Sequence, residues 1–224
     1  EVVIKSQTGS TGRGVFPLRR SPDGWTIVTK TDAIEPQNIA KRLRTLQDDG
    51  LVSGPYFAEE LLGRGDGNAL PVDVKILAFY GEIGLVLLRS AAEHADTRAN
   101  TFRSVLEDGT EVGPIHWKYN PEIPIPGNLD KLVDVARRLS LSISRAFVRI
   151  DMYEIGGRIV FGELTPRPGG GQDFGPEHDE RLGHLWERAH ARVLNDVTDG
   201  SDYILKFGPE PRELRIGKDV FLPA

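Results

Sequence analysis

The hydrophobic pattern of the chain predicts short strands separated by turns, together with three helices. Turns are expected at 21–24, 81–82 and 156–157, where Gly, Pro, Asp or Glu interrupt the apolar runs. Strands are expected where β-branched and other apolar residues alternate with polar ones, at residues 2–4, 14–18, 25–29, 56–62, 72–80, 83–88, 146–153 and 158–164. Helices are expected where apolar residues recur every three or four positions, at about 36–49, 129–142 and 179–196. Strands and helices do not alternate strictly, so the pattern predicts an antiparallel-rich α+β fold.

Capping residues set the ends of the expected helices. Pro36 suits a first helical turn, Gly50 follows the end of that helix, and Asn128 is the expected N-cap of the next one. Residues 90–127 have little periodicity and are expected to be mostly loop, and residues 201–224 to be a weakly patterned tail. We therefore expect three parts: a small lobe at 1–60, a large lobe at 61–200 and the tail at 201–224.

Composition narrows the classes of function. Among 224 residues, 28 Lys and Arg against 33 Asp and Glu give a net charge of −5, which offers no broad basic surface for nucleic acid. No apolar run approaches the roughly 20 residues that span a bilayer, and the first residues do not resemble a signal peptide. The absence of cysteine excludes disulfides and thiolate chemistry. A cytoplasmic protein without membrane or nucleic-acid partners is expected.

A lysine followed by a glycine-rich segment is the first candidate for chemistry. Lys5 closes the first expected strand, and the glycines after it would let backbone N–H groups converge on phosphate oxygens. The candidate phosphate ligands are Lys5, Ser10, Gly12 and Gly14. The segment is not a Walker A motif, because it has no Gly-Lys-Ser/Thr and no helix follows. Taken alone, it fits a plain hairpin loop with an exposed lysine better.

Two further segments are weaker candidates. In 72–76, Asp73 and Lys75 share one face of the expected strand, while the apolar residues occupy the other. A two-residue spacing places this carboxylate and ammonium about 7 Å apart, which suits the ribose and phosphate ends of one nucleotide. For this pair alone, a solvated outer face is the favoured alternative. Residues 57–63 form an extended segment whose backbone can read an adenine edge, but a strand ending in acidic residues is commonplace.

The hairpin of residues 146–153 and 158–164 is more informative. Arg149 and Asp151 share the face opposite Val148, Ile150 and Met152. If Asp151 pairs with Glu163, then Arg149 opposes Thr165 and Tyr153 opposes Phe161, all on that face. This register requires an odd loop, and a three-residue loop would provide it. A two-residue Gly156-Gly157 turn would place the two carboxylates on opposite faces.

Two carboxylates held together repel each other unless a cation lies between them, so Asp151, Glu163 and the Thr165 hydroxyl are candidate ligands of a divalent metal. An Arg149–Glu163 salt bridge on an exposed sheet face is the alternative. The loop that follows, residues 166–174, combines Arg167 with several glycines and can hold an acidic or phosphorylated substrate. A tight connection into the last helix is the plain alternative there.

Taken in order, these residues resemble the ATP-grasp superfamily, and in particular its TupA-like group, which is associated with teichuronopeptide synthesis. The specific part of the resemblance is Val148-Arg-Ile-Asp-Met-Tyr, followed by Gly157-Arg-Ile-Val-Phe-Gly-Glu-Leu-Thr165 and Pro168-Gly-Gly-Gly171. It extends over about residues 1–190. The resemblance implies an ATP-grasp fold, in which two α+β lobes with antiparallel sheets clamp ATP.

The resemblance also implies roles for individual residues. Lys5 would bind ATP phosphates under the 9–14 loop, and Asp73 with Lys75, similar to the Asp-x-Arg of tubulin–tyrosine ligase, would contact ribose and γ-phosphate. Asp151 and Glu163 would bind Mg²⁺, as one or two ions, with Thr165 where many members have asparagine. Arg149 would stabilise the reacting phosphoryl group, as in D-alanine–D-alanine ligase. The adenine would be lined by Glu59, Glu60, Leu61 and Leu62.

The reaction that this resemblance implies is an ATP-dependent ligation of a carboxylate to an amine through an acyl phosphate, forming an amide bond in a biosynthetic pathway. Lys75, Arg149 and Arg167 would be the catalytic cations, and ATP, a carboxylate and an amine the partners. Alternatives are a small-molecule ATP-grasp kinase and a non-catalytic nucleotide-binding domain. The family normally has a further N-terminal lobe, which we expect to precede residue 1. A homodimer is left open.

Overall fold

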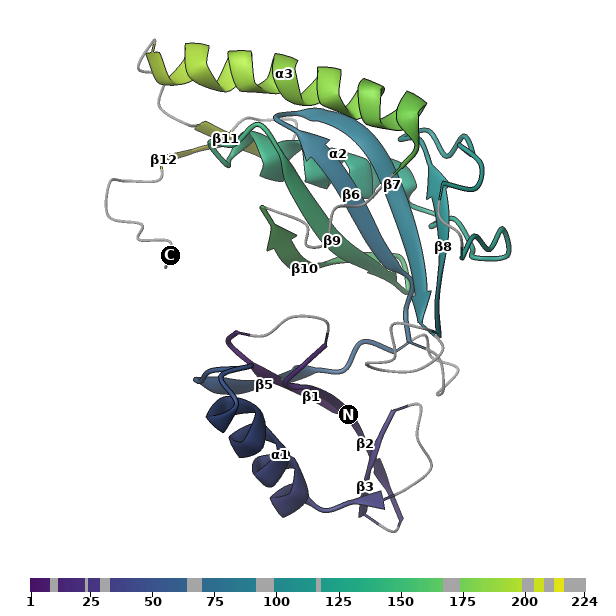
Figure 1. Ribbon diagram of the computed structural model, residues 1–224, viewed down its shortest axis with the longest axis vertical. Helices are drawn as coiled ribbons and strands as arrows, with labels where there is room; N and C mark the ends of the chain where they lie inside the picture. Colours follow the sequence, from purple (N-terminus) through teal and green to yellow (C-terminus); the bar gives the residue numbers. More distant parts are fainter. Residues whose placement is uncertain are drawn as a thin grey trace. The chain divides into compact units, whose positions relative to one another are not determined.

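The computed structural model describes residues 1–8, 12–22, 24–28, 33–63, 70–91, 99–115, 118–166, 174–198, 204–207 and 212–215. The chain forms two compact units (Figure 1). The first unit is Glu1–Pro71 with Ser90–Thr101, and the second is Val72–Arg89 with Phe102–Ala224. The fold is α+β, as predicted. The division into functional lobes at 1–60, 61–200 and 201–224 stays a prediction.

The first unit is an antiparallel sheet packed against one helix. The sheet has the order β4-β3-β2-β1-β5, and its strands are β1 (Val2–Ser6), β2 (Val15–Ser21), β3 (Gly24–Ile27), β4 (Ala33–Ile34) and β5 (Tyr56–Glu60). Helix α1 (Pro36–Asp48) has Pro at its N-terminus, as predicted, and Gly50 follows it at φ +69°. Ile39 and Leu43 of α1 pack on the apolar face of the sheet, which holds Phe16, Leu18, Ile27 and Ile34.

The second unit is built on another antiparallel sheet, in the order β10-β9-β6-β7-β8. Its strands are β6 (Asp73–Phe79), β7 (Glu82–Ala91), β8 (Asn100–Val105), β9 (Val148–Ile155) and β10 (Arg158–Thr165). Helix α2 (Leu129–Leu141) packs on the face that carries Val74, Ile76 and Ile150. Helix α3 (Pro176–Thr198) packs on the opposite face, which carries Leu77, Phe79, Leu85 and Leu87 (Figure 1). Side-chain alternation along each strand therefore supplies two separate apolar clusters.

Both hairpins of this sheet combine a two-residue turn with a glycine bulge. The turns are Tyr80-Gly81 and Gly156-Gly157, and all four residues have positive φ, as a turn that matches the strand twist requires. Between β6 and β7, Leu77 pairs with Leu85 and Ala78 with Ile83, so Gly84 has no partner in the ladder. Between β9 and β10, Phe161 pairs with Met152 and Glu163 with Asp151, so Gly162 has none. Each bulge shifts the pairing by one residue.

The described part of residues 90–127 lies mostly outside helices and strands, as predicted, apart from the end of β7 and the edge strand β8, whose Val105 is fully buried. The structure corrects three other expectations. The tail contains a hairpin of β11 (Ile204–Phe207) and β12 (Arg212–Arg215). Asn128 does precede α2, but its side chain makes no cap; its amide donates to Glu154 instead. The first hairpin of the second unit turns at Tyr80-Gly81 rather than at Gly81-Glu82.

Helices long and apolar enough to cross a membrane do not occur in the described part of the chain.

Candidate active site

Charged residues occupy one end of the sheet face on which α3 packs. Asp73, Lys75, Leu77 and Phe79 occupy every second position of β6 and therefore share one face of the strand. That face is charged near the start of the strand and apolar where α3 covers it. Asp151 on the neighbouring strand β9 pairs with Lys75. These charges are buried, because Asp73, Lys75 and Asp151 are only 4%, 8% and 2% exposed. Buried charges are costly without partners, so their contacts define the site.

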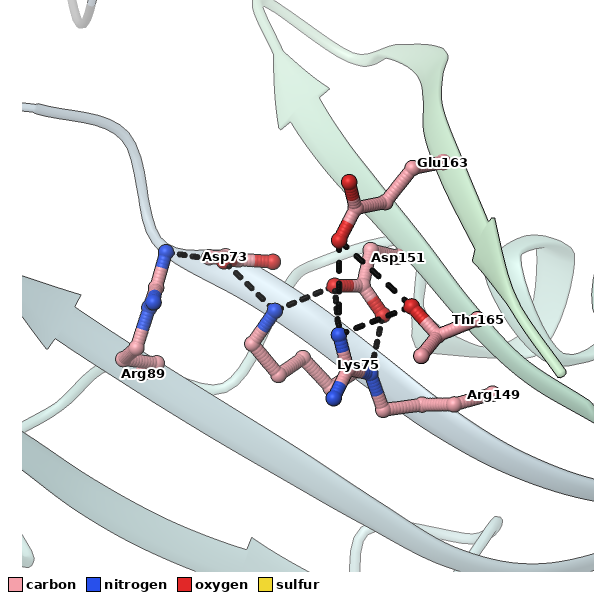
Figure 2. A network of polar contacts seen from close by, with 7 residues as sticks. All are labelled: Asp73, Lys75, Arg89, Arg149, Asp151, Glu163 and Thr165. Carbon is pink, nitrogen blue, oxygen red and sulfur yellow. Dashed lines mark hydrogen bonds and ion pairs between the residues drawn. The ribbon is translucent and has the colours of Figure 1, made fainter. Parts of the chain in front are cut away.

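Asp151 lies at the centre of a network of ion pairs (Figure 2). Arg149 donates from Nε to Oδ1 at 2.6 Å and from a terminal nitrogen to Oδ2 at 2.8 Å. Lys75 donates to the same Oδ2. Burial by itself would raise the pKa of Asp151, but the hydrogen bonds and charges of Arg149 and Lys75 outweigh it, and the pKa lies below its ordinary value. Asp151 is therefore a carboxylate at neutral pH.

Asp73 extends the network to the next strand. Lys75 Nζ lies 2.9 Å from Asp73 Oδ2, and Arg89 of β7 lies 2.6 Å from the same oxygen. The expected separation of about 7 Å between Asp73 and Lys75 is wrong, because the long lysine side chain folds back along the strand face. Lys75 thus bridges two carboxylates, Asp73 and Asp151 (Figure 2).

The bulge at Gly162 brings Glu163 and Thr165 to the network. The predicted pairings of Asp151 with Glu163 and of Arg149 with Thr165 are confirmed. The predicted three-residue loop and the pairing of Tyr153 with Phe161 are wrong, since the turn has two residues and Tyr153 pairs with Val160. Without a bulge, the two-residue turn would place Gly162 opposite Asp151 and turn the Glu163 side chain to the other face of the sheet. Because Gly162 has no partner, the pairing shifts by one residue, and Glu163 lies opposite Asp151 on the same face.

Glu163 is the exposed member of the site, with 66% of its side chain accessible. Its Oε1 lies 3.4 Å from Arg149 and 3.5 Å from the Thr165 hydroxyl, which accepts a 3.0 Å hydrogen bond from Arg149. Partial burial of the carboxyl group and the nearby charge of Asp151 raise the pKa of Glu163 above its ordinary value. Figure 2 shows the carboxylates of Asp151 and Glu163 both directed toward the guanidinium of Arg149.

The donor set fits a hard divalent cation. Mg²⁺ usually binds one or two carboxylates and takes its other ligands from phosphates and water. Asp151 and Glu163 supply two carboxylates and Thr165 a hydroxyl, while no third acidic or histidine side chain joins them among the described residues. Glu163 is the less compensated of the two carboxylates, because it lies 3.4 Å from Arg149 alone, whereas Asp151 contacts both Arg149 and Lys75. These residues therefore suit a cation that arrives with phosphate rather than a closed protein cage.

Only some of the residues predicted to contact ATP in the first unit lie close to one another. Lys5 and Glu59 form an ion pair on adjacent strands. Glu60 lies on the opposite face of β5, because successive side chains alternate. Leu61 is buried, and Leu62 is partly buried just after the strand.

The end of the glycine-rich segment is hydrogen-bonded to the end of β1. The Ser6 amide donates to the Gly14 carbonyl at 3.0 Å, and the Val15 amide to the Gly12 carbonyl at 3.3 Å. Gly12 and Gly14 have φ of +78° and +74°, and a Cβ on Gly14 would lie 2.3 Å from Ser6 Oγ. Glycine is thus required at 14 on steric grounds. Ser10, and Arg167 of the later loop, lie outside the described residues.

Arg89 belongs to the network, although the sequence suggested it only as one of several basic residues that can line the substrate site and not as a partner of Asp73. Its place after the apolar run of β7 gives no signal for that contact, since many surface arginines follow such runs. The bulge at Gly84 places it opposite Asp73, because the register of the Tyr80-Gly81 turn alone would pair Asp73 with Leu88. The glycine inside the strand was the available signal for such a shift.

The chain belongs to the TupA-like ATP-grasp family, whose model matches residues 1–187. The observed α+β fold has the two antiparallel sheets that the resemblance to ATP-grasp proteins implied. The comparison with curated proteins found no match.

Several solved ATP-grasp ligases resemble the chain at low identity. D-alanine–D-alanine ligase from Bacillus anthracis complexed with ATP is 12% identical, with a TM-score of 0.46, over 89% of this chain and 53% of the ligase. The ligase PsnB with Mg and ADP is 16% identical, with a TM-score of 0.37, over 82% and 46%. A RiPP-associated ATP-grasp ligase from Chryseobacterium gregarium, in complex with ADP and a leader and core peptide, is 14% identical, with a TM-score of 0.34, over 96% of this chain and 51% of the ligase. The chain thus spans about half the length of these proteins.

Proposed function

We propose that the protein is an ATP-dependent ligase that joins a carboxylate to an amine through an acyl phosphate. The supporting observation is the convergence of Asp151, Glu163, Arg149 and Lys75 on one face of the second sheet, in a chain of the ATP-grasp family. Two carboxylates for a cation and two cations for phosphoryl oxygens are what phosphoryl transfer requires, because it relies on positioning and charge stabilisation.

In this proposal the network exchanges partners when the nucleotide binds. Asp151 is held by Lys75 and Arg149, each of which has further N–H donors to offer. Mg²⁺ held by Asp151 and Glu163 would neutralise part of the charge on the triphosphate. Lys75 and Arg149 would then donate to phosphoryl oxygens, Arg149 at the transferred group, and Thr165 would keep its hydrogen bond to Arg149. Exclusion of water from the site by the bound nucleotide would strengthen these electrostatic contacts, because it lowers the local dielectric constant.

The chemistry has two steps. An oxygen of the substrate carboxylate attacks the γ-phosphorus, the bond from that phosphorus to the bridging oxygen breaks, and ADP leaves with the electron pair. The amine nitrogen then attacks the acyl carbon, the carbon–oxygen bond to phosphate breaks, and inorganic phosphate leaves while the nitrogen loses a proton to solvent. The guanidinium of Arg149 and the ammonium of Lys75 stabilise the charge that develops on the phosphoryl oxygens.

The remaining predicted residues complete the proposal. Phosphate contacts are assigned to Lys5, Ser10, Gly12 and Gly14, and adenine contacts to Glu59, Glu60, Leu61 and Leu62. Asp73 is assigned to the ribose and Arg167 to an acidic substrate or its phosphorylated form. A cytoplasmic location and a homodimer stay predictions.

The test is a screen for ADP formation with pools of carboxylic acids and amines, preceded by a thermal-shift titration with Mg-ATP. We expect a Mg-ATP-dependent rise in Tm and ADP release that requires both an acid and an amine. Arg149→Ala should slow that release strongly, whereas Arg158→Ala, a change at an exposed arginine at the start of β10, should not.

Other outcomes would contradict the proposal. ADP release without an amine, together with a stable phosphorylated product, would identify a kinase. Mg-ATP binding without turnover against any pool would identify a nucleotide-binding domain.

A further inference from the structure

The charged network has an acidic end and a basic end. Glu163 on β10 and Arg89 on β7 are its most accessible charged side chains, 66% and 34% exposed, whereas Asp151 between them is 3% exposed. The strands lie in the order β10-β9-β6-β7, so these two side chains stand at opposite ends of the row. An anion that approaches the network is therefore repelled at the Glu163 end and attracted at the Arg89 end.

Arg89 has hydrogen-bond donors that its ion pair does not use. One terminal nitrogen of its guanidinium lies 2.6 Å from Asp73 Oδ2. The other terminal nitrogen has no partner among the described residues. A guanidinium carries five N–H donors in a planar fork that matches the two oxygens of a carboxylate. Arg89 can therefore keep its contact with Asp73 and bind a second carboxylate.

A carboxylate on Arg89 would lie next to the phosphoryl-binding part of the network. Lys75 Nζ lies 2.9 Å from the same Asp73 oxygen that Arg89 contacts (Figure 2). The two cationic nitrogens are therefore close enough for one carboxylate to touch both, as that of Asp73 does. In the proposed function Lys75 donates to the phosphoryl group, so an anion between Arg89 and Lys75 would be adjacent to the group that is transferred.

The first step of the proposed reaction needs a cation at this place. The attacking oxygen must be held about 3–3.5 Å from the γ-phosphorus, and the carboxylate and the phosphoryl group repel each other because both are negative. Lys75 and Arg149 are already assigned to phosphoryl oxygens. Arg89 is the remaining cation of the network, and it stands at the end away from the two metal-binding carboxylates.

We infer that Arg89 binds the carboxylate of the acid substrate and holds it beside the transferred phosphoryl group. The guanidinium donates to one carboxylate oxygen while the other oxygen attacks. The bulge at Gly84 makes this possible, because it places Arg89 opposite Asp73 on the face of the network. The assignment rests on the proposed function, since it names the residue that holds the first substrate of that ligase.

A purely structural Arg89 would only neutralise the buried charge of Asp73. The two roles differ measurably, because Asp73 is assigned to the ribose. Loss of a structural contact would therefore weaken the binding of Mg-ATP, whereas loss of a substrate contact would weaken the binding of the acid. Arg89→Lys separates them, since it keeps a positive charge for Asp73 but lacks the planar fork.

The binding test is NMR of the arginine Nε–Hε groups, with sodium acetate as the probe at constant ionic strength. The protein holds Mg²⁺ and the non-hydrolysable ATP analogue AMP-PNP. The Arg89 signal, identified by its absence from Arg89→Lys, should shift saturably with acetate. It should shift at least fivefold less with acetamide, which has a similar shape and no charge. Arg103 of β8 is the internal control, because it pairs with Glu111 at 3.0 Å outside the network, and acetate should move its signal at least fivefold less.

The kinetic test uses the acid that the screen for ADP formation identifies. Arg89→Lys should raise the KM for that acid at least tenfold and change the KM for Mg-ATP less than twofold. Arg103→Lys should change neither value.

Four results would overturn the inference: no shift of the Arg89 signal with acetate, an equal shift with acetamide, an equal shift of the Arg103 signal, or a rise confined to the KM for Mg-ATP. Circular dichroism on the same samples shows that the variants are folded. The Mg-ATP thermal shift separates the two hypotheses. A chain that binds Mg-ATP but whose Arg89 ignores acetate refutes only the substrate contact, whereas a chain without Mg-ATP binding refutes the proposed ligase and this contact with it.

Discussion

Gly162→Ala should damage the site without removing any of its functional groups. A Cβ at 162 would lie 2.9 Å from the carbonyl oxygen of Asp151 and 3.1 Å from the ring of Tyr153. Carbon–oxygen contacts of this kind normally lie at about 3.3–3.6 Å, so the two strands must separate by roughly 0.5 Å. The obstacle is backbone of the neighbouring strand, which no side-chain rotation can move away.

The magnitude follows from that displacement. Overpacking of this kind costs about 2 kcal/mol, which lowers Tm by about 4–8 °C in a chain of this length. A shift of 0.5 Å between Asp151 and Glu163 should reduce turnover by about tenfold, given that misplacement by about 1 Å costs about a hundredfold. Thermal unfolding by circular dichroism and the ADP assay measure the two effects.

Gly183→Ala in α3 is the matched control, because a Cβ there meets nothing within 4 Å. It should keep wild-type turnover and gain about 1 kcal/mol from helix propensity. Wild-type Tm and turnover in Gly162→Ala would refute the assignment of the bulge as the element that sets the spacing of the two carboxylates.

Three further predictions concern charged groups. Arg149→Ala should lower turnover by about 100–1,000-fold while changing Mg-ATP affinity much less, because its guanidinium acts at the transferred group. Asp151→Asn should weaken Mg-dependent nucleotide binding and lower the free energy of unfolding by about 3 kcal/mol, since Lys75 and Arg149 lose their shared buried carboxylate. Glu82→Gln should cost about 0.5–1 kcal/mol at pH 7, because Glu82 pairs with Arg188 at 2.7 Å and with Arg192.

The effect at Glu82 depends on pH in a defined direction. Burial would raise the pKa of Glu82, but hydrogen bonds from Arg188 and Arg192 outweigh it and hold the pKa below 4.5. Since the folded-state pKa is the lower one, the stabilisation is present above about pH 4.5 and is lost as the pH falls through the folded value. The Tm difference between wild type and Glu82→Gln should therefore shrink as the pH falls below 4.5 and through the folded-state pKa of Glu82, and a constant difference across the acid range would refute this account.

Two results would contradict the predictions for Arg149→Ala and Asp151→Asn. An unchanged rate in Arg149→Ala would remove that residue from the reaction. A wild-type Tm in Asp151→Asn would mean that the buried pairs contribute nothing to folding. Both variants need a Mg-ATP titration beside the unfolding curve, so that loss of binding is separated from loss of fold.

Much of the fold could be predicted from the chain because its signals are local. Apolar residues every three or four positions located α1, α2 and α3, and alternation located the strands and the face that Arg149 and Asp151 share. The strand β8 was missed because it lies at the edge of the sheet among polar residues, where alternation is weak. Asn128 was placed correctly at the start of α2, but its side chain makes no cap, because Lys131 Nζ donates to its Oδ1 and its amide nitrogen donates to Glu154, 26 residues away.

The amino-acid sequence by itself determined the fold class, the family and the carboxylate pair Asp151 and Glu163. Only the tertiary structure decided the register between neighbouring strands. Alternation assigns each residue to a face within its own strand but does not say which residue of the next strand lies opposite it. One unpaired glycine in each hairpin, Gly84 and Gly162, shifts that register by one residue. These bulges place Arg89 opposite Asp73 and Glu163 opposite Asp151, and a change of register by one residue turns every following side chain to the opposite face.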